Sequence, residues 1–88
     1  MLSREFIIRN RLGLHARAAA QLVQTANRFA SEVTLVKEDI EVNGKSIMGI
    51  LLLAAPKGTA VSVAVEGPDE EQAMTVLAEL IEDGFGED

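Results

Sequence analysis

The chain contains a single histidine, His15, which stands two residues before Arg17 at the expected start of a helix. The first turn of a helix has free backbone N–H groups and a partial positive charge, and both favour a bound anion. A guanidinium adds fixed donors that suit phosphate oxygens. An imidazole at this place can accept a phosphoryl group on nitrogen and pass it on. The same spacing also fits a surface histidine at a junction between a loop and a helix, with no chemical role.

The other reactive side chains do not form a recognised catalytic pattern. No serine and no acidic residue is marked as the partner that His15 would need in a hydrolytic triad. The segment Gly44-Lys45-Ser46 is not a P-loop, because Asp39 stands where that motif requires a glycine. Without cysteine or a second histidine, the chain has no thiolate zinc site and no paired-histidine site. We therefore expect no metal site of either kind.

A second candidate site lies at Ser46, just before a short apolar segment. Ser46 can be the N-cap of a helix. It can also be a phosphorylation site, because a dianion at the start of a helix interacts favourably with the helix dipole. The apolar side chains that follow cover more than one face of a helix, so some of them must be exposed. These are Ile47, Met48, Leu51 and Leu52. They are either scattered surface residues or a docking patch for partner proteins.

Charge is unevenly distributed along the 88 residues, whose net charge is −6. Residues 1–30 carry five arginines against one acid, whereas residues 31–88 carry three lysines against thirteen acids. General nucleic-acid binding needs many clustered cations and aromatic platforms, but this chain has no basic side chain after Lys57 and only three aromatic residues. The longest apolar run is far shorter than the ~20 residues of a membrane span, and no targeting segment is visible. We expect a cytoplasmic protein whose acidic tail lies far from His15.

The periodicity of apolar residues predicts one α+β domain that comprises residues 1–88. The expected elements are strands at 6–8, 32–37, 40–42 and 60–66, and helices at 16–28, at 47–54 and from Asp69 to Gly84. Asp69 is the expected N-cap of the last helix, with Gln72 at the capping-box position and Gly84 as the C-cap. The order β-α-β-β-α-β-α, with one polar face on each strand, predicts an antiparallel sheet that has its helices on one side.

The chain resembles the HPr family, the histidine phosphocarriers of the bacterial phosphoenolpyruvate-dependent phosphotransferase system. The resemblance rests on two segments at the family's spacing, Gly-Leu-His-Ala-Arg at 13–17 and Asn-Gly-Lys-Ser-Ile-Met-Gly at 43–49. It covers essentially the whole chain. It implies a fold similar to the HPr open-faced β-sandwich, a four-stranded antiparallel sheet covered by three helices.

The resemblance also implies a role for each matching residue. His15 matches the histidine that Enzyme I phosphorylates on Nδ1 and that donates to IIA-type domains, and Arg17 matches the arginine that helps to hold the phosphoryl group. Ser46 matches the serine that HPr kinase/phosphorylase modifies in species that have this enzyme. The surface that docks Enzyme I and the IIA proteins is matched by Ala16, Ala20, Gln24, Ile47, Met48 and Leu51.

Two departures from the family pattern keep alternatives open. Ala18 stands where many members have proline, and the tail 83–88 resembles that of the nitrogen-branch relative, NPr. One alternative is therefore a nitrogen-branch regulator with the same His15 chemistry. An alternative of another class is a regulatory binding module that acts through the phosphorylation state of Ser46. The main expectation is a monomeric, stoichiometric phosphoryl carrier that is not an enzyme and needs no metal or organic cofactor of its own. We also expect that it does not bind nucleic acid and does not insert into membranes.

Overall fold

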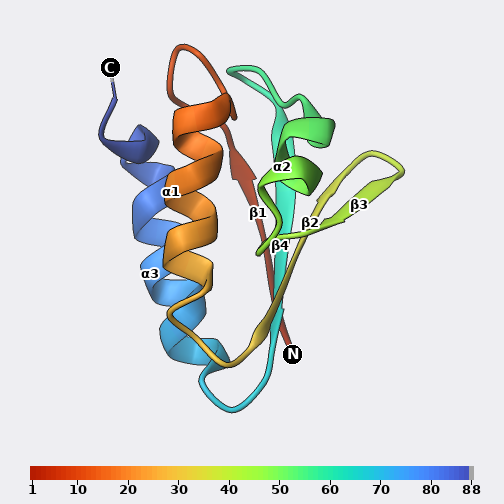
Figure 1. The fold of residues 1–88 in the computed structure, drawn as a ribbon, viewed down its shortest axis with the longest axis vertical. Coiled ribbons are helices and arrows are strands. Elements are labelled where there is room, and N and C mark those ends of the chain that lie inside the picture. The colour runs from red at the N-terminus through yellow and green to blue at the C-terminus, as the bar shows by residue number, and fades with distance from the viewer. Residues whose placement is uncertain (88) are drawn as a thin grey trace.

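The computed structural model describes residues 1–87, which form a four-stranded antiparallel sheet and three helices (Figure 1). The elements follow one another as β1 (Leu2–Ile7), α1 (Ala16–Ala26), β2 (Glu32–Lys37), β3 (Ile40–Asn43), α2 (Ile47–Leu53), β4 (Ala60–Glu66), α3 (Glu70–Glu82) and the short 3-10 turn η1 (Gly84–Gly86). The strand order across the sheet is β1-β4-β2-β3. The predicted α+β class and element order are confirmed.

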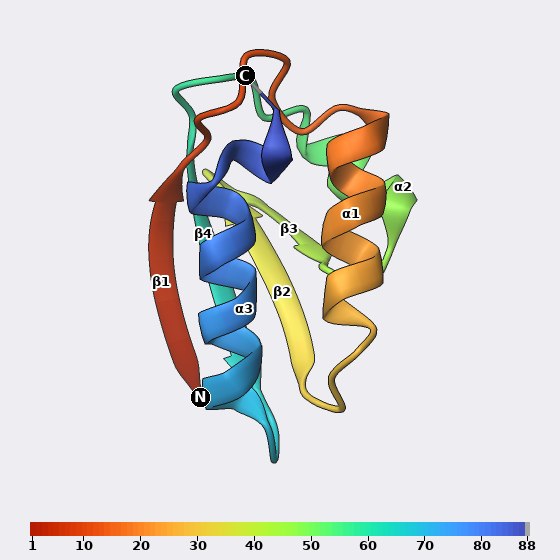
Figure 2. The same cartoon turned by 90° about the vertical axis from the view of Figure 1, so that its left-hand side faces the viewer.

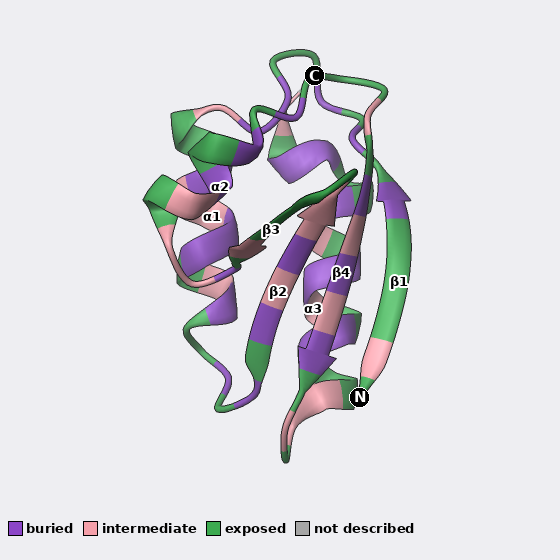
Figure 3. Cartoon of the chain, turned by 90° about the vertical axis from the view of Figure 1, so that its right-hand side faces the viewer, coloured by how far each residue is buried: buried purple, intermediate pink, exposed green. Residues whose placement is uncertain are grey.

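Buried and more exposed side chains alternate along β4. This alternation explains why the sheet has one face that the helices cover, here called the dry face, and one face open to solvent. Val61, Val63 and Val65 are buried, whereas Ser62 and Ala64 between them are only partly buried (Figure 3). Successive side chains of a strand point to opposite faces, so the three valines face the helices. β4 pairs with both β1 and β2, and its valines therefore lie at the centre of the core.

The helices α1 and α3 lie side by side over the dry face of the sheet, and α2 packs against α1 and the edge strand β3 (Figures 1 and 2). Ala18 and Ala19 of α1 are fully buried, and their small side chains allow a close approach to the neighbouring elements. Figure 2 shows that the C-terminal end of the described chain lies at the same end of the molecule as the start of α1. No helix within residues 1–87 is long and apolar enough to cross a membrane.

Several element boundaries differ from the prediction. The last helix ends at Glu82 and its C-cap is Asp83, so the predicted C-cap at Gly84 is wrong by one residue. By a single residue each, β1, β3 and α2 also end elsewhere than predicted, at Ile7, Asn43 and Leu53.

The first strand begins at Leu2 rather than Phe6, because the register runs from Leu2 opposite Val65 to Ile7 opposite Ala60. Its first half exposes Ser3, Arg4 and Glu5 at the sheet edge, so it lacks the apolar signal of a strand. The first helix ends at Ala26, two residues before the predicted end.

The predicted capping box of the last helix is wrong, although Asp69 does precede it. The Asp69 side chain makes no cap hydrogen bond. Its carboxylate instead accepts hydrogen bonds from the backbone N–H groups of Ala30 and Ser31, each at 2.9 Å, and from the Ser31 hydroxyl. These donors lower the pKa of Asp69, the Ser31 hydroxyl most strongly. Asp69 thus ties the start of α3 to the loop that follows α1.

Candidate functional site

The loop before α1 is held in place by Gly13, which has a φ of +69°. A Cβ atom at this position would overlap the carbonyl oxygen of Ala55 and lie 2.7 Å from the Cα of Pro56. The next residue, Leu14, is buried and donates its backbone N–H to Ala55 at 2.8 Å. Glycine is therefore required here both for the left-handed conformation and for the close approach of the 54–59 loop.

His15 is the N-cap of α1, as the sequence predicts, and its imidazole belongs to the helix start. The residue is extended, with φ −81° and ψ −178°, and its Nδ1 accepts the backbone N–H of Arg17 at 3.3 Å. This distance is at the long end for a hydrogen bond, so the Nδ1 lone pair is only weakly engaged. The side chain is 25% exposed. Nδ1 therefore lies beside the unpaired N–H groups of the first turn, where an anion is stabilised.

The tail lies against His15, so the expectation that acidic groups are remote from this residue is wrong. The Nε2 of His15 lies 2.7 Å from Oε2 of Glu87. The other carboxylate oxygen, Oε1, accepts a hydrogen bond of 3.1 Å from Nδ2 of the buried Asn10. Asn10 Nδ2 also donates to the carbonyl of Gly13 at 2.6 Å. One amide group therefore connects the tail to the loop that carries the histidine.

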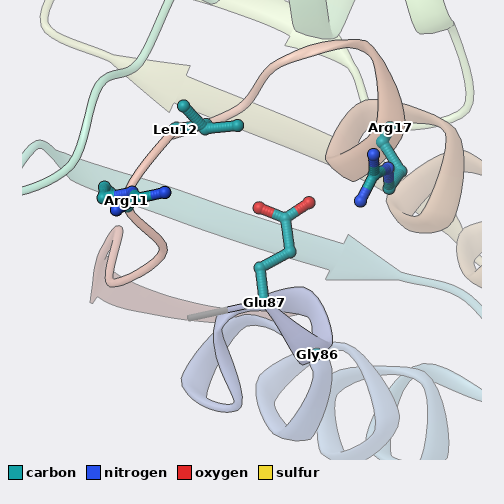
Figure 4. A pocket seen from close by; sticks show the side chains of 5 residues that line it. All are labelled: Arg11, Leu12, Arg17, Gly86 and Glu87. Carbon is teal, nitrogen blue, oxygen red and sulfur yellow. The ribbon is translucent and has the colours of Figure 1, made fainter.

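Glu87 also lies between two arginines at the mouth of the site. A pocket of about 280 Å³ is lined by Arg11, Leu12, Arg17, Gly86 and Glu87. Figure 4 shows the Glu87 carboxylate pointing into the space between the side chains of Arg11 and Arg17. The hydrogen bond from Asn10 lowers the pKa of Glu87 against the opposing effect of burial, and His15 and Arg17 lower it further. Glu87 is therefore a carboxylate at neutral pH, and the site that surrounds it suits anions.

Ser46 is the N-cap of α2, as predicted. Its Oγ accepts the backbone N–H of Gly49 at 3.1 Å, and its own backbone is extended. The side chain is partly buried, and Ile47 and Met48, which follow it, are exposed. A group added to Oγ would therefore lie beside the apolar surface of α2.

The predicted docking residues lie on two neighbouring helices, since α1 and α2 pack against each other. On α1, Ala16 and Gln24 are exposed and Ala20 is partly buried. On α2, Ile47, Met48 and Leu51 are exposed; Met48 has the largest exposed fraction, 73%. Leu12 and Leu52 are also exposed, at 64% and 71%. We call these eight residues, together with Arg17, the α1–α2 face; the exposed side chains that α2 contributes to it are all apolar.

The sequence did not indicate Asn10 or Glu87 as members of the site. Glu87 is 72 residues away from His15 in the chain, and its carboxylate reaches the imidazole only because η1 turns the tail back. Phe85 is buried, and an aromatic residue in this otherwise acidic tail is the one feature of the sequence that could have indicated that the tail is held in place. Within residues 1–87, no group of three or more acidic or histidine side chains could hold a metal ion.

Comparison with known proteins shows the family to which the chain belongs. The family model described as "PTS HPr component phosphorylation site" matches residues 2–83. The chain belongs to the HPr family. The general function of this family is that of a phosphocarrier in the phosphotransferase system, between Enzyme I and IIA-type proteins.

Individual HPr proteins are similar over their full length. The phosphocarrier protein HPr of Xylella fastidiosa is 54% identical, and the match covers 100% of this chain and 99% of that protein. A crystal structure of HPr from Thermoanaerobacter tengcongensis superimposes with a TM-score of 0.96 at 46% identity, over 100% of this chain and 99% of that one. An HPr dimer from the same organism gives a TM-score of 0.79 at 47% identity, over 99% and 100% of the two chains. The open-faced sandwich predicted from the resemblance is confirmed.

Proposed function

We propose that His15 is the phosphoryl acceptor of this HPr-family phosphocarrier and that it reacts through Nδ1. The observation that carries the proposal is the position of Nδ1 at the N-cap of α1, 3.3 Å from the backbone nitrogen of Arg17. A phosphoryl group on this nitrogen meets free N–H groups and the positive end of the helix dipole. The guanidinium of Arg17, in the same turn, supplies further donors.

The transfer needs a nucleophile and an anion site, and this chain supplies both. The lone pair of Nδ1 forms the bond to phosphorus while the bond from phosphorus to its donor on Enzyme I breaks. Transfer to a IIA-type domain is the reverse step with a different acceptor. Because the donor supplies the activated phosphoryl group, the chain acts as a stoichiometric carrier and not as an enzyme.

Incubation with Enzyme I and phosphoenolpyruvate tests this assignment directly. The intact mass should rise by one phosphoryl group that is labile in acid and stable in base, and the His15→Ala variant should not be modified. Modification of the His15→Ala variant under the same conditions would refute the assignment. Comparing transfer rates to sugar-type and nitrogen-type IIA domains identifies the branch of the system in which this carrier works.

We propose that the α1–α2 face docks Enzyme I and the IIA-type domains. It surrounds the start of α1, so a partner seated on it faces His15. Its exposed apolar side chains on α2 include Met48, whose flexible thioether adapts to different partners. A carrier that exchanges partners needs small, short-lived interfaces of this kind.

Ser46 is the proposed regulatory site, a substrate of HPr kinase/phosphorylase where that enzyme exists. A phosphoryl group on its Oγ places a dianion beside the exposed apolar residues Ile47 and Met48. Docking on the α1–α2 face then becomes unfavourable, and phosphorylation of His15 slows. The Ser46→Asp variant should accept phosphate from Enzyme I more slowly than the wild type. An unchanged rate would exclude this regulation.

The working form that we propose is a cytoplasmic monomer. A monomer leaves the α1–α2 face free for alternating partners, and the HPr dimer of T. tengcongensis shows that an oligomer must be tested for. Sedimentation at micromolar concentration should give a mass near the 9.4 kDa of one chain. A dimer that persists on dilution would contradict this assignment.

A further inference from the structure

We propose that Glu87 is a positioning residue for phosphoryl transfer: its carboxylate holds the Nε2–H of His15, so that Nδ1 is the unprotonated ring nitrogen and faces the start of α1. This inference rests on the proposed role of His15 and extends the site to the C-terminal tail. Its basis is the 2.7 Å contact between Nε2 and Oε2, which joins two side chains that are 25% and 13% exposed.

The carboxylate is fixed from its other side by Asn10. This side chain is 1% exposed, and its Nδ2 donates to both Glu87 Oε1 and the Gly13 carbonyl. Rotating the amide would place its oxygen against two acceptor oxygens, so the present orientation is the only favourable one. Asn10 Oδ1 has no hydrogen-bond partner within the described chain. The two hydrogen bonds from Nδ2 offset the free energy that this buried, unpaired oxygen costs.

The backbone of the tail is shaped to bring Glu87 to this place. Gly84, Phe85 and Gly86 have consecutive φ values of +66°, +58° and +74°. Phe85 is not a glycine, and this conformation is unfavourable for it. Its ring is buried in the core, which holds the turn in place, and Glu87 donates its backbone N–H to Gly84 at 3.0 Å. The tail is therefore anchored at residue 85, and Glu87 contacts His15.

The chemical consequence concerns the proton on the imidazole. A carboxylate accepts only, so it favours the imidazole form that has its proton on Nε2. Nδ1 can then attack phosphorus without first losing a proton. As the N–P bond forms and the bond to the donor breaks, the ring becomes positively charged, with its proton still on Nε2. The Glu87 carboxylate stabilises that charge.

The Glu87 carboxylate and the new phosphoryl group are both negatively charged, so a positive group must lie close to both to reduce their repulsion. Arg17 lines the same pocket as Glu87 and lies in the first turn of α1, beside Nδ1. Its guanidinium can therefore interact with the phosphoryl oxygens on one side and with the carboxylate on the other. Arg11 lines the same pocket on the far side of Glu87 and places a second positive charge near the carboxylate.

The test compares Glu87→Ala, Glu87→Gln and Glu79→Ala in single-turnover transfer from phosphorylated Enzyme I. Glu79 lies exposed on α3 and makes no side-chain hydrogen bond or ion pair within the described residues, so its variant controls for the loss of one negative charge. Glu87→Ala should slow transfer by roughly tenfold, the lower end of the loss seen when a carboxylate that orients a metal-bound histidine is removed. Its affinity for Enzyme I should be unchanged, and its melting temperature should fall by no more than about 4–8 °C, because one hydrogen bond from the Asn10 amide is lost. Glu87→Gln, which keeps an acceptor oxygen but loses the negative charge, should restore only part of the rate.

A spectroscopic readout separates positioning from a general structural role. The Nε2–H proton of His15 should give a slowly exchanging NMR signal in the wild type and in Glu87→Gln, and this signal should be lost in Glu87→Ala. Equal transfer rates for the wild type and Glu87→Ala would overturn the proposal, as would equal slowing by Glu79→Ala. If wild-type His15 accepts no phosphate, the proposed function fails instead, and the NMR signal still decides whether Glu87 holds Nε2.

Discussion

Replacing Gly13 with alanine tests whether the loop before α1 is what places His15. Gly13 has a φ of +69°, and a Cβ there would overlap the Ala55 carbonyl oxygen and approach the Pro56 Cα to 2.7 Å. Both obstacles are backbone atoms, so no side-chain rotation relieves the overlap. Gly58 is a matched control, because its φ is +91° and a Cβ there would meet nothing within 4 Å.

The difference between the two variants isolates the steric overlap. Each alanine costs roughly 1–2 kcal/mol for the left-handed backbone, and each gains about 0.4–1 kcal/mol from a less flexible unfolded chain. Only Gly13→Ala adds the cost of overpacking, about 1–3 kcal/mol. In a domain of this size, 1 kcal/mol shifts the melting temperature by about 4–8 °C. Gly13→Ala should therefore melt at least about 4 °C below Gly58→Ala.

Calorimetry and the transfer assay with Enzyme I measure the two consequences together. The Gly13 carbonyl accepts from Asn10, and the same loop leads directly into His15, so relief of the overlap moves the imidazole. Gly13→Ala should slow phosphoryl transfer at a temperature where the variant is still folded, whereas Gly58→Ala should not. If both variants had the same melting temperature and the same transfer rate, the role assigned to this loop would be refuted.

Three further variants test other parts of the structure. Ser46→Ala should lower the free energy of unfolding by about 1 kcal/mol in urea titrations, because the N-cap of α2 is lost, and an unchanged midpoint would contradict the cap. Met48→Glu should raise the KM for this carrier as the substrate of Enzyme I while stability changes by less than about 0.5 kcal/mol; an unchanged KM would remove Met48 from the docking surface. Asp69→Asn tests the pH dependence of stability. Hydrogen bonds hold the Asp69 pKa below its ordinary value of 3.8, so the stability that the carboxylate provides is present above pH 3.8 and is lost as pH falls through the lower folded-state pKa. Acid titration of Asp69→Asn should lack this loss, and identical acid profiles would contradict it.

The sequence predicted those parts of the site that depend on local structure. The N-caps at His15 and Ser46 follow from the residues immediately around them, since a cap needs only one acceptor side chain and the next turn of helix. The buried stripes of the helices and the alternation of β4 were likewise visible as periodic apolar residues.

The parts that the sequence did not predict depend on contacts between distant segments. Asp69 had the pattern of a capping box, but the loop after α1 offers it three donors, which its own helix does not. Glu87 reaches His15 only through the buried Phe85 and its left-handed backbone, and no local rule predicts that turn. The first half of β1 is exposed at the sheet edge, and only its register with β4 identifies it as a strand.

The most direct test of the account is to identify the nitrogen of His15 that carries the phosphoryl group. Long-range nitrogen–phosphorus coupling in NMR spectra of the ¹⁵N-labelled, phosphorylated protein distinguishes the two ring positions. We expect coupling to Nδ1, with the proton remaining on Nε2 beside Glu87. Phosphorus on Nε2, or on a residue other than His15, would contradict it.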